Sequence, residues 1–231
     1  MGHMQQPTDT PTVTQEDLEA ARTAYEAREP QDLFYRAATE LVERAIHDDI
    51  PRELSREAVD RRVRQVAPLN LAESLAVLLR TWNAAFYRFH QPFDAKHFND
   101  IGSLLTRYES RLSALRRRSI STLSKDDEEG VRSLFAAFEG VLGPVGAAKA
   151  LHLLAPRFFP LWDTVIAQVI YHLPMKPQGF NADNYCRFMS IVREQCSRLG
   201  GEEAVGRNPL KALDEHNYCR SHLPQNLRGT T

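Results

Sequence analysis

The chain has 231 residues, of which 42% are hydrophobic and 26% are charged, and this composition excludes a protein that is disordered throughout. Its formal net charge of −1 excludes nucleic-acid binding by overall charge, so such binding would need a local basic surface. Three cysteines and no apolar run of about 20 residues exclude a secreted disulfide scaffold and a membrane span, and they indicate a cytoplasmic protein.

The N-terminal half is predicted to be helical after an unstructured start. Residues 1–13 are expected to be an expression tag followed by a disordered stretch rich in Pro, Thr and Gln. Thr14 with Asp17 forms a capping-box pattern that starts a helix to about Arg28. Further helices are predicted over residues 33–46, 54–66 and 70–89.

The C-terminal half continues with helical spacing. Asp94 is expected to start a helix that reaches Leu112, and Ser124 with Asp127 caps the helix that follows. Two more helices are predicted over residues 181–199 and 209–220. No segment alternates with period two over the length of a strand, so the predicted class is all-α, a single compact domain over residues 14–231. Because coiled-coil heptads are absent, a monomer is expected.

Residues 138–167 carry the most specific pattern. They read as a helix, a short turn containing Gly143 and Gly146, a second helix, a proline-rich loop, and a third helix beginning at Asp163. A glycine turn that opens a helix leaves backbone N–H groups free to hold a phosphate of DNA without reading its sequence. The alternative is an ordinary connection between two helices, with Gly143 as the C-terminal cap.

Two stretches of this segment, Gly143-Pro-Val-Gly146 with Ala150 four residues on, and Phe159-Pro-Leu-Trp-Asp163, resemble the helix-hairpin-helix DNA glycosylase superfamily. The resemblance implies a helical enzyme with a central helix-hairpin-helix motif. Such an enzyme binds double-stranded DNA, flips a modified base and cleaves its N-glycosidic bond. The loop before Asp163 is a few residues shorter than in well-known members. The cysteine spacing does not match the four-cysteine cluster of some members, so no cofactor and no metal are expected.

Asp163 is the predicted catalytic carboxylate. Cleavage of an N-glycosidic bond builds an oxocarbenium-like sugar, which a carboxylate beside the anomeric carbon stabilises, or for which it activates water. Aspartate before an apolar helical run is also a good N-cap. The two roles are compatible, because one oxygen can cap the helix while the other faces a substrate.

Lys149 is a second catalytic candidate, and His152 is a base-binding candidate one turn further along. A buried lysine with a lowered pKa can form a Schiff base with the sugar. The catalytic lysine of bifunctional superfamily members would fall near Ala148, one position earlier, so the monofunctional reaction is favoured and lyase activity stays open. The alternatives are a solvated or phosphate-contacting lysine and a histidine that merely packs.

Asn83, Tyr87 and Trp162 are further candidates for reading a flipped base, because an amide beside aromatic rings offers both hydrogen bonds and stacking. Core packing is the alternative for all three. The predicted contacts to the DNA backbone come from the turn and from the densest run of positive charge, namely Gly143, Val145, Gly146, Arg116, Arg117 and Arg118.

His216, Cys219 and His222 are spaced by three, which could begin a zinc site on a helix, but no fourth ligand is near in sequence and no metal is predicted. The leading hypothesis is a DNA glycosylase that leaves an abasic site, with its target base open and with DNA repair or defence against phages carrying modified bases as its setting. The alternatives are a non-catalytic module that binds DNA or a protein, and a purely structural helical protein without DNA affinity.

Overall fold

The computed structural model describes residues 11–27, 31–47 and 70–222. Every regular element in these ranges is helical, which confirms the predicted all-α class. The region predicted as one domain is built of two compact units: a larger unit of residues 1–32 and 108–231, and a smaller unit of residues 33–107. The helix predicted over residues 54–66 and the tag predicted at residues 1–10 lie outside the described residues.

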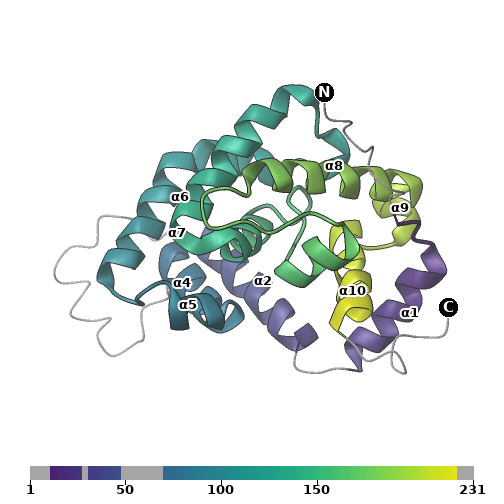
Figure 1. The fold of residues 1–231 in the computed structure, drawn as a ribbon, viewed down its shortest axis with the longest axis horizontal. Coiled ribbons are helices and arrows are strands. Elements are labelled where there is room, and N and C mark those ends of the chain that lie inside the picture. Colours follow the sequence, from purple (N-terminus) through teal and green to yellow (C-terminus); the bar gives the residue numbers. More distant parts are fainter. Residues whose placement is uncertain (1–10, 28–30, 48–69, 223–231) are drawn as a thin grey trace. The chain divides into compact units, whose positions relative to one another are not determined.

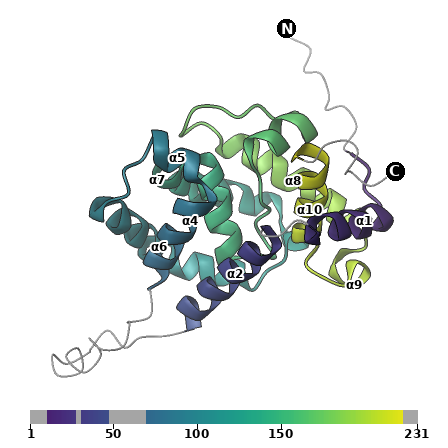
Figure 2. The same ribbon diagram turned by 90° about the horizontal axis from the view of Figure 1, so that it is seen from below.

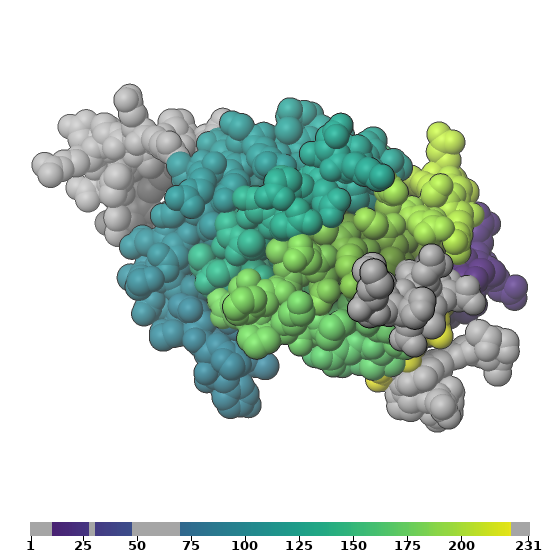
Figure 3. Space-filling model, turned by 45° about the horizontal axis from the view of Figure 1, so that its top comes forward, coloured from purple at the N-terminus to yellow at the C-terminus, as the bar shows by residue number. Residues whose placement is uncertain are grey.

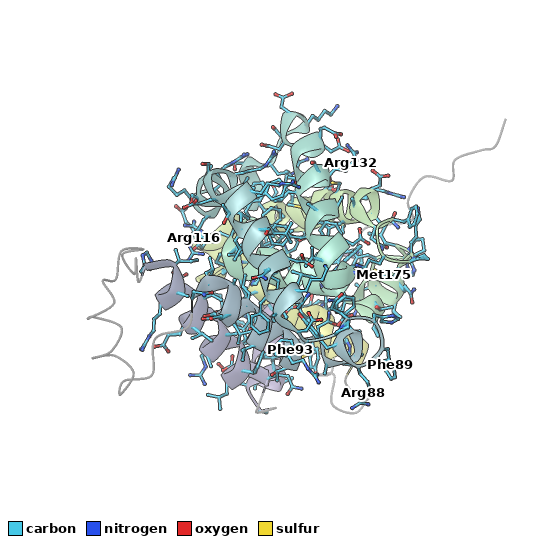
Figure 4. The ribbon with its side chains drawn as sticks, turned by 90° about the vertical axis from the view of Figure 1, so that its left-hand side faces the viewer. Arg88, Phe89, Phe93, Arg116, Arg132 and Met175 are labelled. Carbon is cyan, nitrogen blue, oxygen red and sulfur yellow. The ribbon has the colours of Figure 1, made fainter. Side chains whose placement is uncertain are left out.

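The smaller unit is built from parts or all of four helices. They are α2 (Gln31–His47), α4 (Leu71–Trp82), α5 (Ala84–Phe89) and α6 (Ala95–Arg116), of which α2 and α6 extend across the boundary. The helix predicted over residues 70–89 is interrupted at Asn83, whose φ of −127° and ψ of 42° lie outside the helical range. Phe89, at the end of the predicted helix, is 71% exposed and has the guanidinium of Arg88 5.9 Å from its ring centroid (Figure 4).

The larger unit contains the last turns of α6 and most of the remaining helices. These are α1 (Gln15–Glu26), η1 (Ile120–Thr122), η2 (Lys125–Asp127), α7 (Glu128–Leu154), η3 (Ile166–Ile170), α8 (Ala182–Arg198), α9 (Gly201–Val205) and α10 (Pro209–His222). The first and last of these helices, α1 and α10, pack side by side (Figures 1 and 2). Helix α7 packs along α8, and the two form adjoining teal and green surfaces in Figure 3.

Local hydrogen bonds place the helix starts where the sequence predicts them. Thr14 accepts from the backbone of Asp17 and Asp17 accepts from the backbone of Thr14, which completes the capping box of α1. Asp94 accepts from the backbone N–H of His97 at 2.9 Å and caps α6. Pro11 to Val13, expected to be disordered, are packed instead, since Val13 is buried and the Pro11 carbonyl accepts from Gln195 at 3.0 Å.

Helix α7 is bent at Gly143. The φ of 69° and ψ of 168° at this residue are open only to glycine, and Pro144 can begin the next helical segment because the first position of a helix needs no N–H partner. Two helical segments therefore meet at Gly143, and Val145 and Gly146, predicted to lie in a turn, are inside the second segment. That the bend at Gly143 binds DNA as a helix-hairpin-helix motif stays a prediction.

An aromatic cluster holds the proline-rich loop against α7 and α8. The rings of Phe135 and Tyr185 stack with centroids 4.1 Å apart, and Trp162 lies edge-on to Tyr185 at 5.2 Å. The hydroxyl of Tyr185 donates to the Pro160 carbonyl at 2.8 Å. Large buried rings contribute much of a core's free energy, so this cluster fixes the loop that ends at Asp163.

Residues Lys125–Leu154 form a helical stretch that is long and apolar enough to cross a membrane by length and composition, although the sequence predicts no span. In its most apolar window, 61% is buried inside the protein. A central core helix passes the same test, so the stretch is weak evidence for a membrane span.

Candidate functional site

Asp163 lies at the start of a short helical turn and uses only one of its two carboxylate oxygens to cap it. Oδ1 accepts from the backbone N–H of Ile166 at 2.8 Å, and the Asp163 carbonyl accepts from Ala167 at 2.9 Å. Oδ2 lies 3.4 Å from Nε2 of His222, and 28% of the side chain is exposed. The capping role is therefore confirmed, and the second oxygen remains directed toward a titratable group at an accessible position.

Trp162 ties this carboxylate to the bend in α7. Its indole Nε1–H donates to the carbonyl of Pro144 at 3.2 Å, and the ring is buried. The residue before Asp163 is thus hydrogen-bonded to the residue after Gly143. Because Trp162 is inside the aromatic cluster, its ring is not presented to a flipped base, and its role in this structure is to fix the loop.

His222 comes from the last turn of α10 and was missed as a partner of Asp163. Its ring stacks on Tyr218 with centroids 4.6 Å apart and planes 12° apart, and its Nδ1 lies 2.7 Å from the hydroxyl of Ser221. The sequence singled out His222 only as a zinc ligand. No local pattern links it to Asp163, because the contact joins two elements distant in the chain.

Lys149 lies on the second segment of α7, half-buried near the same carboxylate. Burial lowers the pKa of Lys149 to about 8, against the opposing effects of the carboxylates Asp163 and Asp214. A lysine with a lowered pKa is more often neutral and hence more nucleophilic. The structure therefore brings the two predicted catalytic residues, Asp163 and Lys149, into one electrostatic neighbourhood.

His152 is fully buried and is not at an accessible position in this structure. Its Nδ1 lies 2.7 Å from the carbonyl of Phe159, and burial lowers the pKa of His152 to about 4. The ring is therefore neutral near pH 7, and because a carbonyl oxygen can only accept, Nδ1–H donates to Phe159. These contacts give His152 a packing role beneath the loop.

The run of three arginines divides in two. Arg116, labelled in Figure 4, donates to the carbonyls of Leu153 and Leu154, at 3.4 and 2.7 Å, and caps the end of α7. Arg118 makes a bidentate pair with Asp127 at 2.7 and 2.8 Å. The guanidinium groups of Arg116 and Arg118 are therefore bound to other groups of the protein. Of the three arginines, Arg117 is exposed and stays a candidate contact to DNA.

Asn83 and Tyr87 belong to the smaller unit. Asn83 is half-buried at the break between α4 and α5, and its backbone N–H donates to Leu79 at 2.8 Å. Tyr87 is buried, its hydroxyl lies 3.0 Å from Nε2 of His97, and burial raises the pKa of Tyr87 to about 12. These contacts give Tyr87 a packing role within its unit, and base reading by Asn83 and Tyr87 stays a prediction.

The three C-terminal metal candidates face different neighbours. The Cys219 thiol donates to the carbonyl of Ala21 at 3.5 Å, His216 is buried, and His222 is turned to Asp163. Within residues 11–27, 31–47 and 70–222, no group of three His, Cys, Asp or Glu side chains is arranged to hold a metal ion.

A groove of about 1350 Å³ lies elsewhere on the larger unit and does not include Asp163. It is lined partly by α8 and carries both signs of charge, for example Arg187 and Arg193 beside Glu194 and Glu203. A surface of mixed charge does not favour binding of a polyanion. The candidate site is therefore the one around Asp163, chosen for its carboxylate, and not the groove, chosen for its volume.

No family model, no curated protein and no solved structure matches this chain.

Proposed function

We propose that this protein is a DNA glycosylase that flips a modified or damaged base from double-stranded DNA and cleaves its N-glycosidic bond, with Asp163 as the essential carboxylate. The product is an abasic site. The reaction is proposed to be monofunctional, to need no cofactor, and to be carried out by a monomer in the cytoplasm, in DNA repair or in defence against phages.

The observation that carries the proposal is the fixed, partly exposed carboxylate of Asp163. One oxygen is held by the backbone of Ile166, and the preceding residue, Trp162, is tied to Pro144 at the bend of α7. A carboxylate held in place before the reaction stabilises developing positive charge without further rearrangement. This is what an oxocarbenium-like transition state requires.

The bend supports the DNA-binding half of the proposal. The second segment of α7 begins at the Gly143–Pro144 junction, where the first N–H groups of a helix and its dipole favour a negative charge. The Trp162 hydrogen bond links this junction to the residue before Asp163. A phosphate bound at the junction would therefore hold one nucleotide in register with the carboxylate.

The first experiment compares wild type with Asp163→Asn on DNAs that carry normal, damaged and phage-type modified bases. Released bases are identified by mass spectrometry, and abasic sites are detected as strand breaks after alkali. We expect base release to fall by about 10²- to 10³-fold in Asp163→Asn, since transition-state charge stabilisation is lost. Because Asn caps nearly as well as Asp, the free energy of unfolding should change by less than about 1 kcal/mol and DNA binding should persist.

Asp94→Asn is the matched control. Asp94 also caps a helix through one carboxylate oxygen, at 2.9 Å from the His97 N–H, and it lies in the smaller unit. Asp94→Asn should keep the wild-type rate of base release.

Strand breaks that need no alkali would assign Schiff-base chemistry to Lys149.

The alternative proposal is a non-catalytic module that binds DNA or a protein. No release from any DNA, with binding equal in wild type and Asp163→Asn, would support this alternative and contradict the glycosylase. A chain without salt-dependent DNA binding would contradict both proposals, because phosphate contacts make affinity fall steeply with salt.

A further inference from the structure

The hydrogen bonds around His222 determine which of its ring nitrogens carries a proton. The hydroxyl of Ser221 lies 2.7 Å from the Asn217 carbonyl and 2.7 Å from Nδ1 of His222. A carbonyl oxygen can only accept, so the single hydroxyl proton of Ser221 is donated to Asn217. The bond to His222 then requires Nδ1–H as the donor and the Ser221 oxygen as the acceptor.

This assignment leaves Nε2 as the nitrogen that faces Asp163. In a neutral ring with the proton on Nδ1, the lone pair of Nε2 points toward Oδ2 at 3.4 Å, and two acceptors face each other. In the imidazolium form, Nε2–H faces the carboxylate and attracts it. A proton between Nε2 and Oδ2, in addition to the one on Nδ1, therefore turns a contact between two acceptors into an attractive one.

The surroundings of the pair agree with a proton-carrying ring. His222 is the last residue of α10, where the helix dipole favours a cation. Tyr218 fixes the plane of the ring from one side. Among the described residues, Lys149 of α7 is a charged group that Asp163 influences, and Asp214 of α10, whose carboxylate accepts from Lys211 at 2.7 Å, acts on the same lysine.

We propose that His222 is a second catalytic residue of this site, the acid that protonates the departing base, and that it acts with Asp163 as one proton-sharing pair. The inference rests on the proposed glycosylase function and deepens it. As the C1′–N bond breaks, its electron pair stays on the base nitrogen, which takes the proton from Nε2. Water forms the new C1′–O bond and gives a proton to Oδ2 of Asp163. That proton passes to Nε2 across the contact and restores the starting pair.

The first test needs no substrate. Nitrogen NMR of the histidine side chains in the full chain, at a pH where His222 is neutral, reports which ring nitrogen is protonated. We expect Nδ1–H in wild type and a shift toward Nε2–H in Ser221→Ala, which removes the acceptor. Resonances of His222 and His47 are assigned with His222→Gln and His47→Gln. An Nε2–H ring in neutral wild type would overturn the inference, because Nε2 could then not receive a proton from Asp163.

The second test is the pH profile of base release. His222→Gln keeps an N–H that can bond to Oδ2 but cannot deliver a proton. We expect kcat to fall by about 10²-fold, KM to stay within twofold, and the alkaline decline of the wild-type profile to disappear. His47→Gln is the matched control, since His47 lies 3.5 Å from Glu43 but is 75% exposed in the smaller unit. It should behave as wild type.

The outcomes separate the two proposals. Wild-type rates and an unchanged pH profile in His222→Gln, with Asp163→Asn inactive, would overturn the role of His222 and leave the glycosylase intact. Full base release by Asp163→Asn would overturn Asp163 as the essential carboxylate and, with it, the proton-sharing pair. No base release by wild type from any DNA would overturn the glycosylase itself.

Discussion

Two carboxylates of the larger unit, Glu215 and Asp163, have opposite environments. Glu215 belongs to α10, and Asp163 contacts His222 of the same helix. Glu215 is fully buried between Arg22 and Arg207, with an Nη1–Oε1 distance of 2.8 Å to Arg22. Asp163 is 28% exposed, and its Oδ2 lies 3.4 Å from Nε2 of His222. A carboxylate whose oxygens are both occupied by permanent cations holds helices together, whereas one with a weakly engaged oxygen retains capacity for a substrate.

Lys211, which is buried, and Lys149, which is half-buried, repeat this contrast. Burial disfavours the charge on Lys211, but Asp214, Tyr25 and Glu215 outweigh it and raise the pKa of Lys211. Burial prevails at Lys149 and lowers its pKa to about 8. A lowered lysine pKa beside a partly exposed carboxylate is typical of a functional site, so the comparison favours the Asp163 neighbourhood over the Glu215 cluster, which consists of Glu215, Arg22 and Arg207.

The largest stability effect is expected in the Glu215 cluster. Glu215→Gln removes the charge of a fully buried carboxylate that pairs with Arg22 and Arg207, and it should lower the free energy of unfolding by about 2–4 kcal/mol. Urea denaturation measures it. The control Glu194→Gln removes an exposed pair with Arg198 and should cost at most about 0.5 kcal/mol. Equal costs in the two variants would mean that Glu215 is not a structural carboxylate.

A pH series sharpens the contrast between the lysines. The folded-state pKa of Lys149, about 8, is below its ordinary 10.5, so between these values the unfolded chain binds more protons. The stabilising contribution of neutral Lys149 is fully present above pH 10.5 and is lost as the pH falls through about 8. Wild type should therefore gain about 1–3 kcal/mol relative to Lys149→Met from pH 7 to pH 10.5. A constant difference across this range would contradict the lowered pKa.

Trp162→Phe tests the link between the bend of α7 and Asp163. Phenylalanine keeps an aromatic ring in the cluster but loses the donor to Pro144, so we expect a cost of about 1–2 kcal/mol in stability. The rate of base release should fall by more than the loss of folded protein explains, because the hydrogen bond from Trp162 to Pro144 no longer links Asp163 to the bend. Thermal unfolding and release rates are measured on the same samples, and unchanged release would show that the link is only structural.

The smallest effect is expected at Arg117. Arg117→Ala should weaken DNA binding a few-fold for all sequences and reduce the slope of log affinity against log salt by about 0.9, as expected for one phosphate contact. Fluorescence titrations at several salt concentrations measure the slope. Arg118→Ala should leave the slope unchanged and instead lower stability, since Arg118 is paired with Asp127. A changed slope in Arg118→Ala and none in Arg117→Ala would reverse the assignment.

Much of the local structure follows from the sequence because it depends on neighbours three or four residues apart. The capping box at Thr14, the cap at Asp94 and the all-helical class are of this kind. So is the cap that Asp163 provides for Ile166. The break at Asn83 escaped prediction because the apolar spacing continues across it, and spacing does not report a change in backbone dihedrals.

The uses of particular side chains were decided by tertiary structure. Charge density selected Arg116 and Arg118 as DNA contacts, but Arg116 caps a helix end formed by Leu153 and Leu154, and Arg118 pairs with Asp127. His222 meets Asp163 only because α10 packs against the η3 turn (Figure 1). The sequence alone determined which residues start and end helices, since those hydrogen bonds are local. Only the folded chain decided which polar groups are consumed by the protein and which stay available, because their partners come from distant segments.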